Sequence, residues 1–133
     1  MPRIFLHFLL LPGLVLASVS TSAHHAVSMV YLPEQMVSVT GVVEEFRFHN
    51  PHCVIFLTRT NDAGETERWT IEWAGSSALR RQGVTAETLK PGDEITVTGF
   101  PARDGSPGMA MRVLEFADGR PAINPPDRSG ANE

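Results

Sequence analysis

Cysteine is almost absent from this sequence, because Cys53 is the only one in 133 residues. No disulfide can form within the chain, so the packing of apolar side chains must stabilise the fold. Basic residues are also few, with 11 Lys and Arg against 15 Asp and Glu and a formal net charge of −4 at pH 7. A mildly acidic protein repels phosphate backbones, and the charge balance therefore predicts that nucleic acid is not a partner.

A long apolar run is also missing. The run Ile4–Ala17 is shorter than the about 20 residues that a membrane-spanning helix needs, and Pro12 interrupts it. Arg3 precedes this run and the small residues Thr21–Ala23 follow it, which is typical of a signal peptide. We therefore expect residues 1–23 to be removed and the mature chain to be secreted across the inner membrane into the periplasm, without stable membrane insertion.

Short runs of β-forming residues separated by turns make up most of the remaining chain. Strands are expected at residues 37–48, 53–58, 67–73, 94–100 and 109–116. A short helix is expected to begin near Ser76 and to end at Gly83. In the third strand Trp69, Ile71 and Trp73 alternate with polar residues, so these three side chains are expected to share one buried face.

The first strand has two features that predict a bend. Its apolar phase flips at Glu44-Glu45, which indicates a β-bulge, and Gly41 indicates sharp curvature. A long bent first strand, followed later by a helix between strands three and four, is typical of the oligonucleotide/oligosaccharide-binding (OB) barrel. The expected fold class is all-β with one short helix, a five-stranded OB-like Greek-key barrel of order β-β-β-α-β-β. An open β-sandwich is the alternative.

The expected domain organisation follows from these elements. Residues 24–36 contain Pro33 and have no clean periodicity, so they are expected to form an extended N-terminal arm. The barrel is expected at residues 37–118. Residues 119–133 are polar and proline-rich, and a disordered tail is expected there.

Two histidines, His24 and His25, stand at the expected cleavage site. Cleavage after Ala23 leaves an α-amine and an imidazole on His24, whereas cleavage after Ser22 leaves the sequence Ala-His-His. Both products offer nitrogen donors in the tetragonal arrangement that Cu(II) prefers. The α-amine has an ordinary pKa of about 8, so its deprotonation for metal binding is feasible.

Two further histidines, His49 and His52, flank Asn50-Pro51, where proline stiffens the connection between the first two strands. They are expected to join the N-terminal histidines as metal ligands if the arm folds back to this connection. The candidate cofactor is copper, and the expected metal ligands are His24, His25, His49 and His52. Hydrogen bonding within a turn and the start of the second strand are the alternative roles of His49 and His52.

The other candidate residues have simpler explanations. Cys53 is expected to be a small buried apolar residue, and the methionines that could bind Cu(I) are expected mainly in the core. Five aromatic residues could stack on a planar ligand but also suit a barrel core; they are Phe46, Phe48, Phe56, Trp69 and Trp73. No pair of side chains has the spacing for nucleophilic or acid–base catalysis, so the protein is not expected to be an enzyme.

Several motifs together resemble a small exported bacterial family, DUF6152. They are AHH, FHNPH, the tryptophan strand, LKPGDEITVTGFPARDGS and FADGR, within residues 23–120. The resemblance implies a periplasmic OB-like barrel and no settled activity. Cys53-Val54 departs from the family, where relatives usually have large apolar residues. The expected function is a periplasmic binding module for a Cu(II)-class metal, with a non-metal module for a small ligand or an unknown protein partner as the alternative.

Overall fold

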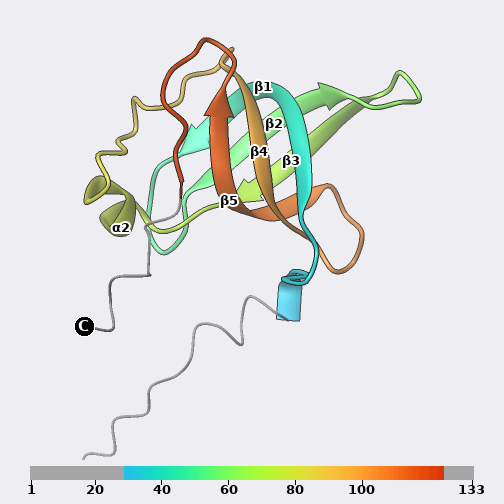
Figure 1. Ribbon diagram of the computed structural model, residues 1–133, viewed down its shortest axis with the longest axis horizontal. Helices are drawn as coiled ribbons and strands as arrows, with labels where there is room; N and C mark the ends of the chain where they lie inside the picture. The colour runs from blue at the N-terminus through green and yellow to red at the C-terminus, as the bar shows by residue number, and fades with distance from the viewer. Residues whose placement is uncertain (1–28, 125–133) are drawn as a thin grey trace, which may run out of the picture.

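The computed structural model describes residues 29–124, which form five strands and one short helix (Figure 1). The elements are β1 (Val37–Arg47), β2 (Val54–Thr60), β3 (Thr66–Glu72), α2 (Ser76–Arg80), β4 (Glu94–Pro101) and β5 (Gly108–Phe116). This is the expected order β-β-β-α-β-β. No helix in the described part of the chain has the length and apolar character needed to cross a bilayer.

The five strands close into a barrel in the order β1-β2-β3-β5-β4, with β1 also paired to β4. Neighbouring strands are antiparallel except β3 and β5, which pair in parallel over only three residues, Thr70–Glu72 against Gly108–Ala110. Five strands closed in this order, with the helix between β3 and β4, make an OB-like barrel. The closed barrel confirms the expected fold class and excludes the open sandwich.

The bend in β1 occurs where the sequence predicts it. The register against β2 shifts between Val43 and Glu45, so Glu44 is the extra residue of a β-bulge. A Cβ added to Gly41 would lie 2.6 Å from the carbonyl oxygen of Thr58. Glycine therefore lets β1 approach β2 closely enough to bend from one partner strand to the other.

The barrel interior is filled by the inward-facing side chains of all five strands. Ile71 is fully buried, whereas Trp69 and Trp73 are partly buried and pack against the core from the same face of β3. Cys53 is also fully buried, in a smaller cluster with Leu79 and Val84. These positions confirm the expected phase of β3 and the expected apolar role of Cys53.

Both ends of the described chain return to the barrel. Tyr31 forms an antiparallel bridge with Ala102, and the amide of Leu32 donates to the carbonyl oxygen of Pro101 at 3.0 Å. At the other end Ile123 forms a bridge with Leu114 and packs on the core. In the described part of the expected arm, residues 29–30 form a helical turn, and the backbone hydrogen bonds that follow hold the chain against the end of β4. Residues 1–28 and 125–133, which include the expected leader and most of the expected tail, lie outside the described residues.

Candidate functional site

The connection between β1 and β2 carries the histidines at positions 49 and 52, and it is fastened to the start of α2. The Asn50 side chain accepts a hydrogen bond from the amide of Ser77 at 3.2 Å and donates to the Ser77 hydroxyl at 2.8 Å. The N-cap residue of this helix is Gly75, which supplies no side-chain cap. Asn50, from a distant part of the sequence, instead satisfies the orphan amide.

His49 has a mainly structural role in this connection. Its carbonyl oxygen accepts hydrogen bonds from the amide of Ser76 at 3.2 Å and from the thiol of Cys53 at 3.4 Å. Its exposed ring places Nδ1 3.2 Å from the carbonyl oxygen of Asn50. The turn contact proposed as the alternative role of His49 is therefore present.

His52 lies in a different environment, beside the carboxylate of Glu72 on β3. Nδ1 of His52 contacts Oε1 of Glu72, and 53% of the His52 side chain is exposed. The second oxygen of the same carboxylate, Oε2, accepts a hydrogen bond from the Tyr31 hydroxyl at 2.7 Å. Glu72 thus joins the arm to the β1–β2 connection.

The environment of Tyr31 changes its acidity. Burial against the barrel raises the pKa of its phenol, and the hydrogen bond to Glu72 and the negative charge of that carboxylate raise the pKa further. Each effect disfavours the phenolate, by desolvation or by repulsion. Tyr31 therefore remains a neutral hydrogen-bond donor to Glu72 over the physiological pH range.

The sequence alone did not single out Glu72 or Tyr31, because Glu72 is one of several polar residues that alternate with Trp69, Ile71 and Trp73. A signal for Glu72 was nonetheless present. Counting back from the turn after β2 pairs Val54 with Glu72, so His52 is a diagonal cross-strand neighbour of that carboxylate. Nothing in the local sequence predicts that Tyr31 reaches the same carboxylate, because the contact requires the closed barrel.

Metal-binding groups are only partly assembled within residues 29–124. In this range no group of three or more His, Cys, Asp or Glu side chains could hold a metal ion. The carboxylate-bound ring of His52 is one candidate donor, whereas His24 and His25 lie outside the described residues. The Cys53 thiol is a poor candidate because it is buried and burial raises its pKa.

The methionines also divide by position. Met109 and Met111 are core residues, whereas 78% of Met29 and 54% of Met36 are exposed. The expected use of methionine as core filler therefore holds for Met109 and Met111 and not for the two exposed methionines.

The outer face of β2 carries one aromatic ring that the barrel core does not use. The guanidinium of Arg68 lies over the Phe56 ring at 3.9 Å from its centroid, and that of Arg47 lies at 4.6 Å. Glu44 and Glu45, at the bulge of β1, hold Arg68 and Arg47 through paired hydrogen bonds. These arginines cover Phe56, so the ring itself is not an open stacking platform. The aromatic residues Phe46, Phe48 and Trp73 instead contact one another beside the core.

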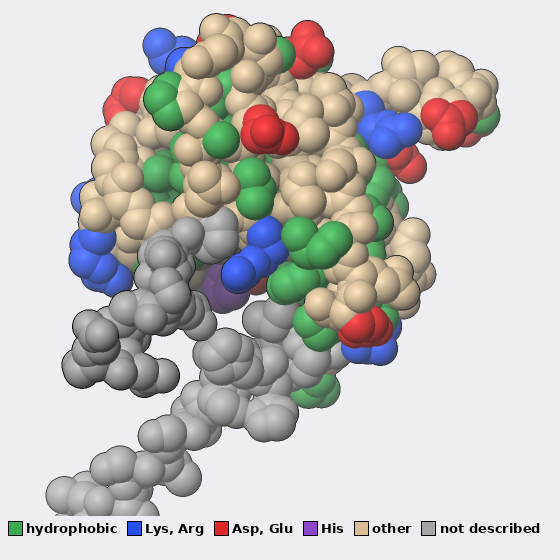
Figure 2. Space-filling model, viewed as in Figure 1, with side chains coloured by type: hydrophobic (Ala, Val, Ile, Leu, Met, Phe, Trp, Pro, Cys, Tyr) green, Lys and Arg blue, Asp and Glu red, His purple; other side chains and the backbone are tan. Residues whose placement is uncertain are grey.

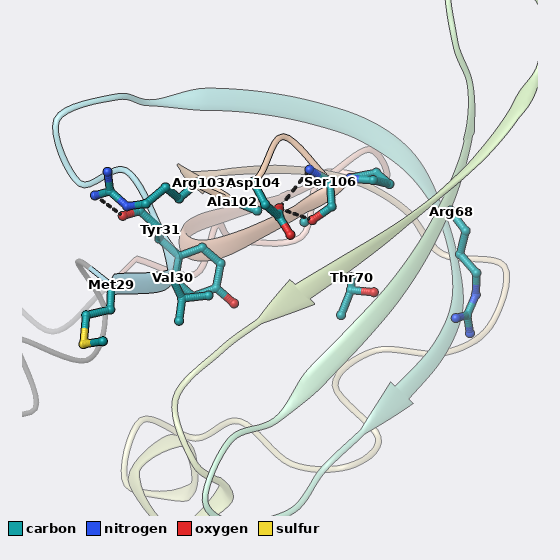
Figure 3. A pocket seen from close by; sticks show the side chains of 11 residues that line it. Met29, Val30, Tyr31, Arg68, Thr70, Ala102, Arg103, Asp104 and Ser106 are labelled. Carbon is teal, nitrogen blue, oxygen red and sulfur yellow. Dashed lines mark hydrogen bonds between the residues drawn. The ribbon is translucent and has the colours of Figure 1, made fainter.

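A groove of about 620 Å³ lies beside β3, on the side where β5 separates from it (Figure 3). We call it the edge groove. The arm forms one wall, the loop between β4 and β5 forms another, and Arg68 and Thr70 supply the β3 side. It is lined by Met29, Val30, Tyr31, Arg68, Thr70, Ala102, Arg103, Asp104, Ser106, Pro107 and Gly108. Its volume is within the range of roughly 300–1,000 Å³ that is usual for ligand sites.

Two solved structures are similar to this chain in fold. One is a mitochondrial single-stranded DNA-binding protein from S. cerevisiae, Rim1, with 14% identity and a TM-score of 0.48 over 62% of this chain and 93% of that chain. The other is a small single-stranded DNA-binding protein from Streptomyces coelicolor, with 19% identity and a TM-score of 0.42 over 65% of this chain and 95% of that chain. No curated protein sequence matches the chain.

The expectation that nucleic acid is not a partner is corrected here, since both of these proteins are described as binding single-stranded DNA, which is a property of those proteins. The net charge of the whole chain does not exclude a nucleic-acid partner. A whole-chain charge is an average, and the potential of a single face depends on how its charges are arranged. Acidic and basic side chains are interspersed on the face that Figure 2 shows. Nucleic acid is therefore not excluded as a partner by the charge of this chain.

The sequence profile of a family of unknown function matches residues 13–110, which is well over half of the chain. This match agrees with the motifs AHH, FHNPH and LKPGDEITVTGFPARDGS, all three of which lie in the matched range. The protein belongs to this family, DUF6152.

Proposed function

We propose that this protein is an exported binding module for a Cu(II)-class metal ion, with His52 and the N-terminal histidines as ligands. The observation that carries the proposal is the contact between His52 Nδ1 and the Glu72 carboxylate. A histidine that binds a metal commonly donates its other ring nitrogen to a carboxylate, which fixes the tautomer and orients the ring. With Nδ1 engaged in this way, Nε2 of the half-exposed ring is the nitrogen available to a metal.

The anchored arm supports the inclusion of His24 and His25. Tyr31 binds the same carboxylate as His52, and His24 precedes Tyr31 by only seven residues in the sequence. An extended segment of that length spans at most about 25 Å, which is long enough for the N-terminal donors to reach the β1–β2 connection. Tethering raises the local concentration of these donors around His52.

The donor set suits copper better than harder ions. Imidazole nitrogens and a processed α-amine are nitrogen donors, which Cu(II) prefers in a tetragonal arrangement. Carboxylate-rich sites that would favour Ca²⁺ or Mg²⁺ require several oxygen ligands. In this proposal Glu72 orients His52, and binding rather than catalysis is the function.

The test is calorimetric titration of Cu(II) into protein with its natural processed N-terminus. Glu72→Gln should weaken Cu(II) binding by about 10–100-fold, as is typical when the group orienting a metal-bound histidine is lost. His52→Ala should weaken binding at least as much. His49→Ala is the matched control, because its ring contacts the Asn50 carbonyl and not a carboxylate.

The N-terminal part of the site has its own test. A protein with an added N-terminal tag should bind Cu(II) more weakly than the processed protein, since the tag removes the free amine. Mass spectrometry of the exported protein identifies the first residue, and His24→Ala or His25→Ala then identifies the N-terminal ligand. Equal affinity for the tagged, processed and His52→Ala forms contradicts the proposal.

A non-metal binding function is the second candidate, and the edge groove is the observation that favours it. The groove does not include His52 or Glu72, so a ligand there would not contact the proposed metal ligand His52 or the carboxylate that orients it. A groove ligand should still bind after metal removal with a chelator.

A further inference from the structure

The carboxylate of Glu72 contacts two segments of the chain that are far apart in the sequence. Its Oε1 contacts Nδ1 of His52 in the β1–β2 connection, and its Oε2 accepts a hydrogen bond from the Tyr31 hydroxyl of the arm at 2.7 Å. The Tyr31 ring extends from the arm toward the end of β3, where Glu72 lies (Figure 3). The position of one segment can therefore influence the other through a single side chain.

The backbone of Glu72 is fixed on both sides, whereas its side chain is not. The residue pairs with Val54 of β2 and with Ala110 of β5, so its backbone has little freedom to move. The side chain is 34% exposed, and a glutamate without partners populates several rotamers whose restriction costs conformational entropy. The hydrogen bond from Tyr31 to Oε2 already restricts the rotamer, so less entropy is lost when Oε1 holds the ring of His52.

The arm is held along the end of β4 by backbone hydrogen bonds on either side of Tyr31. The amide of Leu32 donates to the carbonyl oxygen of Pro101 at 3.0 Å, and the amide of Arg103 donates to the carbonyl oxygen of Val30 at 2.9 Å. A short segment held by few hydrogen bonds opens locally at a lower free energy than the whole domain unfolds. The Tyr31 hydroxyl adds a side-chain contact to β3, so docking of the arm and the rotamer of the carboxylate are linked.

Docking of the arm also shortens the tether to the N-terminal histidines. His24 precedes Tyr31 by seven residues in the sequence, but it precedes Val37, the first residue of β1, by thirteen. The effective concentration of a tethered donor falls roughly as the −3/2 power of the tether length, so release of the arm lowers it about 2.5-fold. The orientation of His52 and the shorter tether therefore both favour metal binding when the arm is docked.

We infer that Tyr31 is a positioning residue for the metal ligand His52, acting through Glu72, so that docking of the arm and binding of the metal favour each other. This inference rests on the metal-binding function proposed above and names the element that regulates it. Linkage makes the effect reciprocal, because the metal favours docking by the same factor by which docking raises the affinity for the metal. When the arm is released, the His52 ring is less well oriented and the site binds metal more weakly.

The experiment is calorimetric titration of Cu(II) into the processed chain and its variants. Tyr31→Phe should weaken binding about fivefold, at the lower end of the usual coupling between two sites, with the same stoichiometry. The effect should be smaller than that of Glu72→Gln, because the carboxylate that contacts His52 is still present. Ser38→Ala is the matched control, since it removes a hydroxyl that contacts Thr98 at 2.7 Å and not Glu72.

Two further measurements separate positioning from simple fastening of the arm. In a Glu72→Ala background, Tyr31→Phe should have almost no further effect on the Cu(II) affinity, because the hydroxyl has already lost its acceptor. In the unsubstituted chain, Cu(II) should slow hydrogen exchange at the amides of Leu32 and Arg103, and it should slow exchange less in Tyr31→Phe. Fastening alone predicts faster exchange in Tyr31→Phe with an unchanged Cu(II) affinity. Thermal melts establish that each variant is folded at the temperature of the titration.

Two results overturn the inference and leave the metal site in place. One is an unchanged Cu(II) affinity in Tyr31→Phe while Glu72→Gln weakens binding, and the other is an equal effect of Tyr31→Phe with and without the Glu72 carboxylate. A loss of affinity in Ser38→Ala as large as that in Tyr31→Phe also overturns it. Absence of Cu(II) binding by the unsubstituted chain overturns the proposed metal site and this inference together, which distinguishes the two failures.

Discussion

Tyr31 connects the arm to the histidine-bearing connection through a single hydroxyl group. That hydroxyl donates to Glu72, and Glu72 also holds His52. Burial and the nearby carboxylate raise the pKa of Tyr31 above its ordinary value. Since it is the only tyrosine in the chain, its ionisation can be followed directly.

We expect the tyrosinate absorbance of the folded protein to appear only well above pH 10, the ordinary pKa of tyrosine being about 10. The unfolded chain ionises first as the pH rises, so stability from this group is present below about pH 10 and is lost above it. As the pH is raised above about 10, the free energy of unfolding should therefore fall less for Tyr31→Phe than for the unsubstituted protein. Urea denaturation at several pH values measures this difference. Ordinary titration near pH 10 in the folded protein would show that the arm is not docked.

Cys53 offers a second test at the scale of one residue. The thiol is fully buried beside Leu79 and Val84, and its pKa is raised by burial. We expect it to react with a disulfide reagent far more slowly in the native protein than in denaturant, because the thiolate is the reactive form. Rapid labelling of the native protein would show that the cluster around α2 opens readily.

At the scale of elements, the bend of β1 depends on a glycine and a bulge. Gly41→Ala places a methyl group 2.6 Å from the Thr58 carbonyl oxygen, which forces β1 and β2 apart. We expect a loss of about 1–3 kcal/mol in the free energy of unfolding, the usual cost of overpacking. Urea denaturation measures it.

Gly64→Asn is the control for that substitution. Gly64 has a φ of +80° and nothing within 4 Å of an added Cβ, and asparagine tolerates this conformation better than other residues. Its cost should be clearly smaller than that of Gly41→Ala. Equal costs would mean that backbone conformation and not close approach of the strands makes Gly41 necessary.

The elements themselves were largely predictable from the sequence. The bulge at Glu44 and the buried face of Ile71 follow from local apolar periodicity, which depends only on neighbouring residues. The start of α2 was not predictable in detail. Its amide partner is Asn50, which is distant in the sequence, so no local capping pattern contains it.

At the scale of the whole molecule, metal binding should change the stability of the fold. A ligand that binds only the folded state stabilises it by about 2.7 kcal/mol at a free concentration 100 times its dissociation constant. Processed protein should show such a rise in urea denaturation with Cu(II), and the rise should disappear in His52→Ala. An equal rise in the variant would place copper elsewhere on the chain.

The sequence by itself determined the order of the elements, the curvature of β1 and the apolar character of Cys53. Each depends on residue type and on spacing along a single strand. Only the tertiary structure decided that Tyr31, His52 and Glu72 meet at one carboxylate, and that β3 leaves half of its outer edge uncovered. The physical reason is that both features depend on barrel closure and on the register between strands, which join segments whose local patterns carry no information about one another.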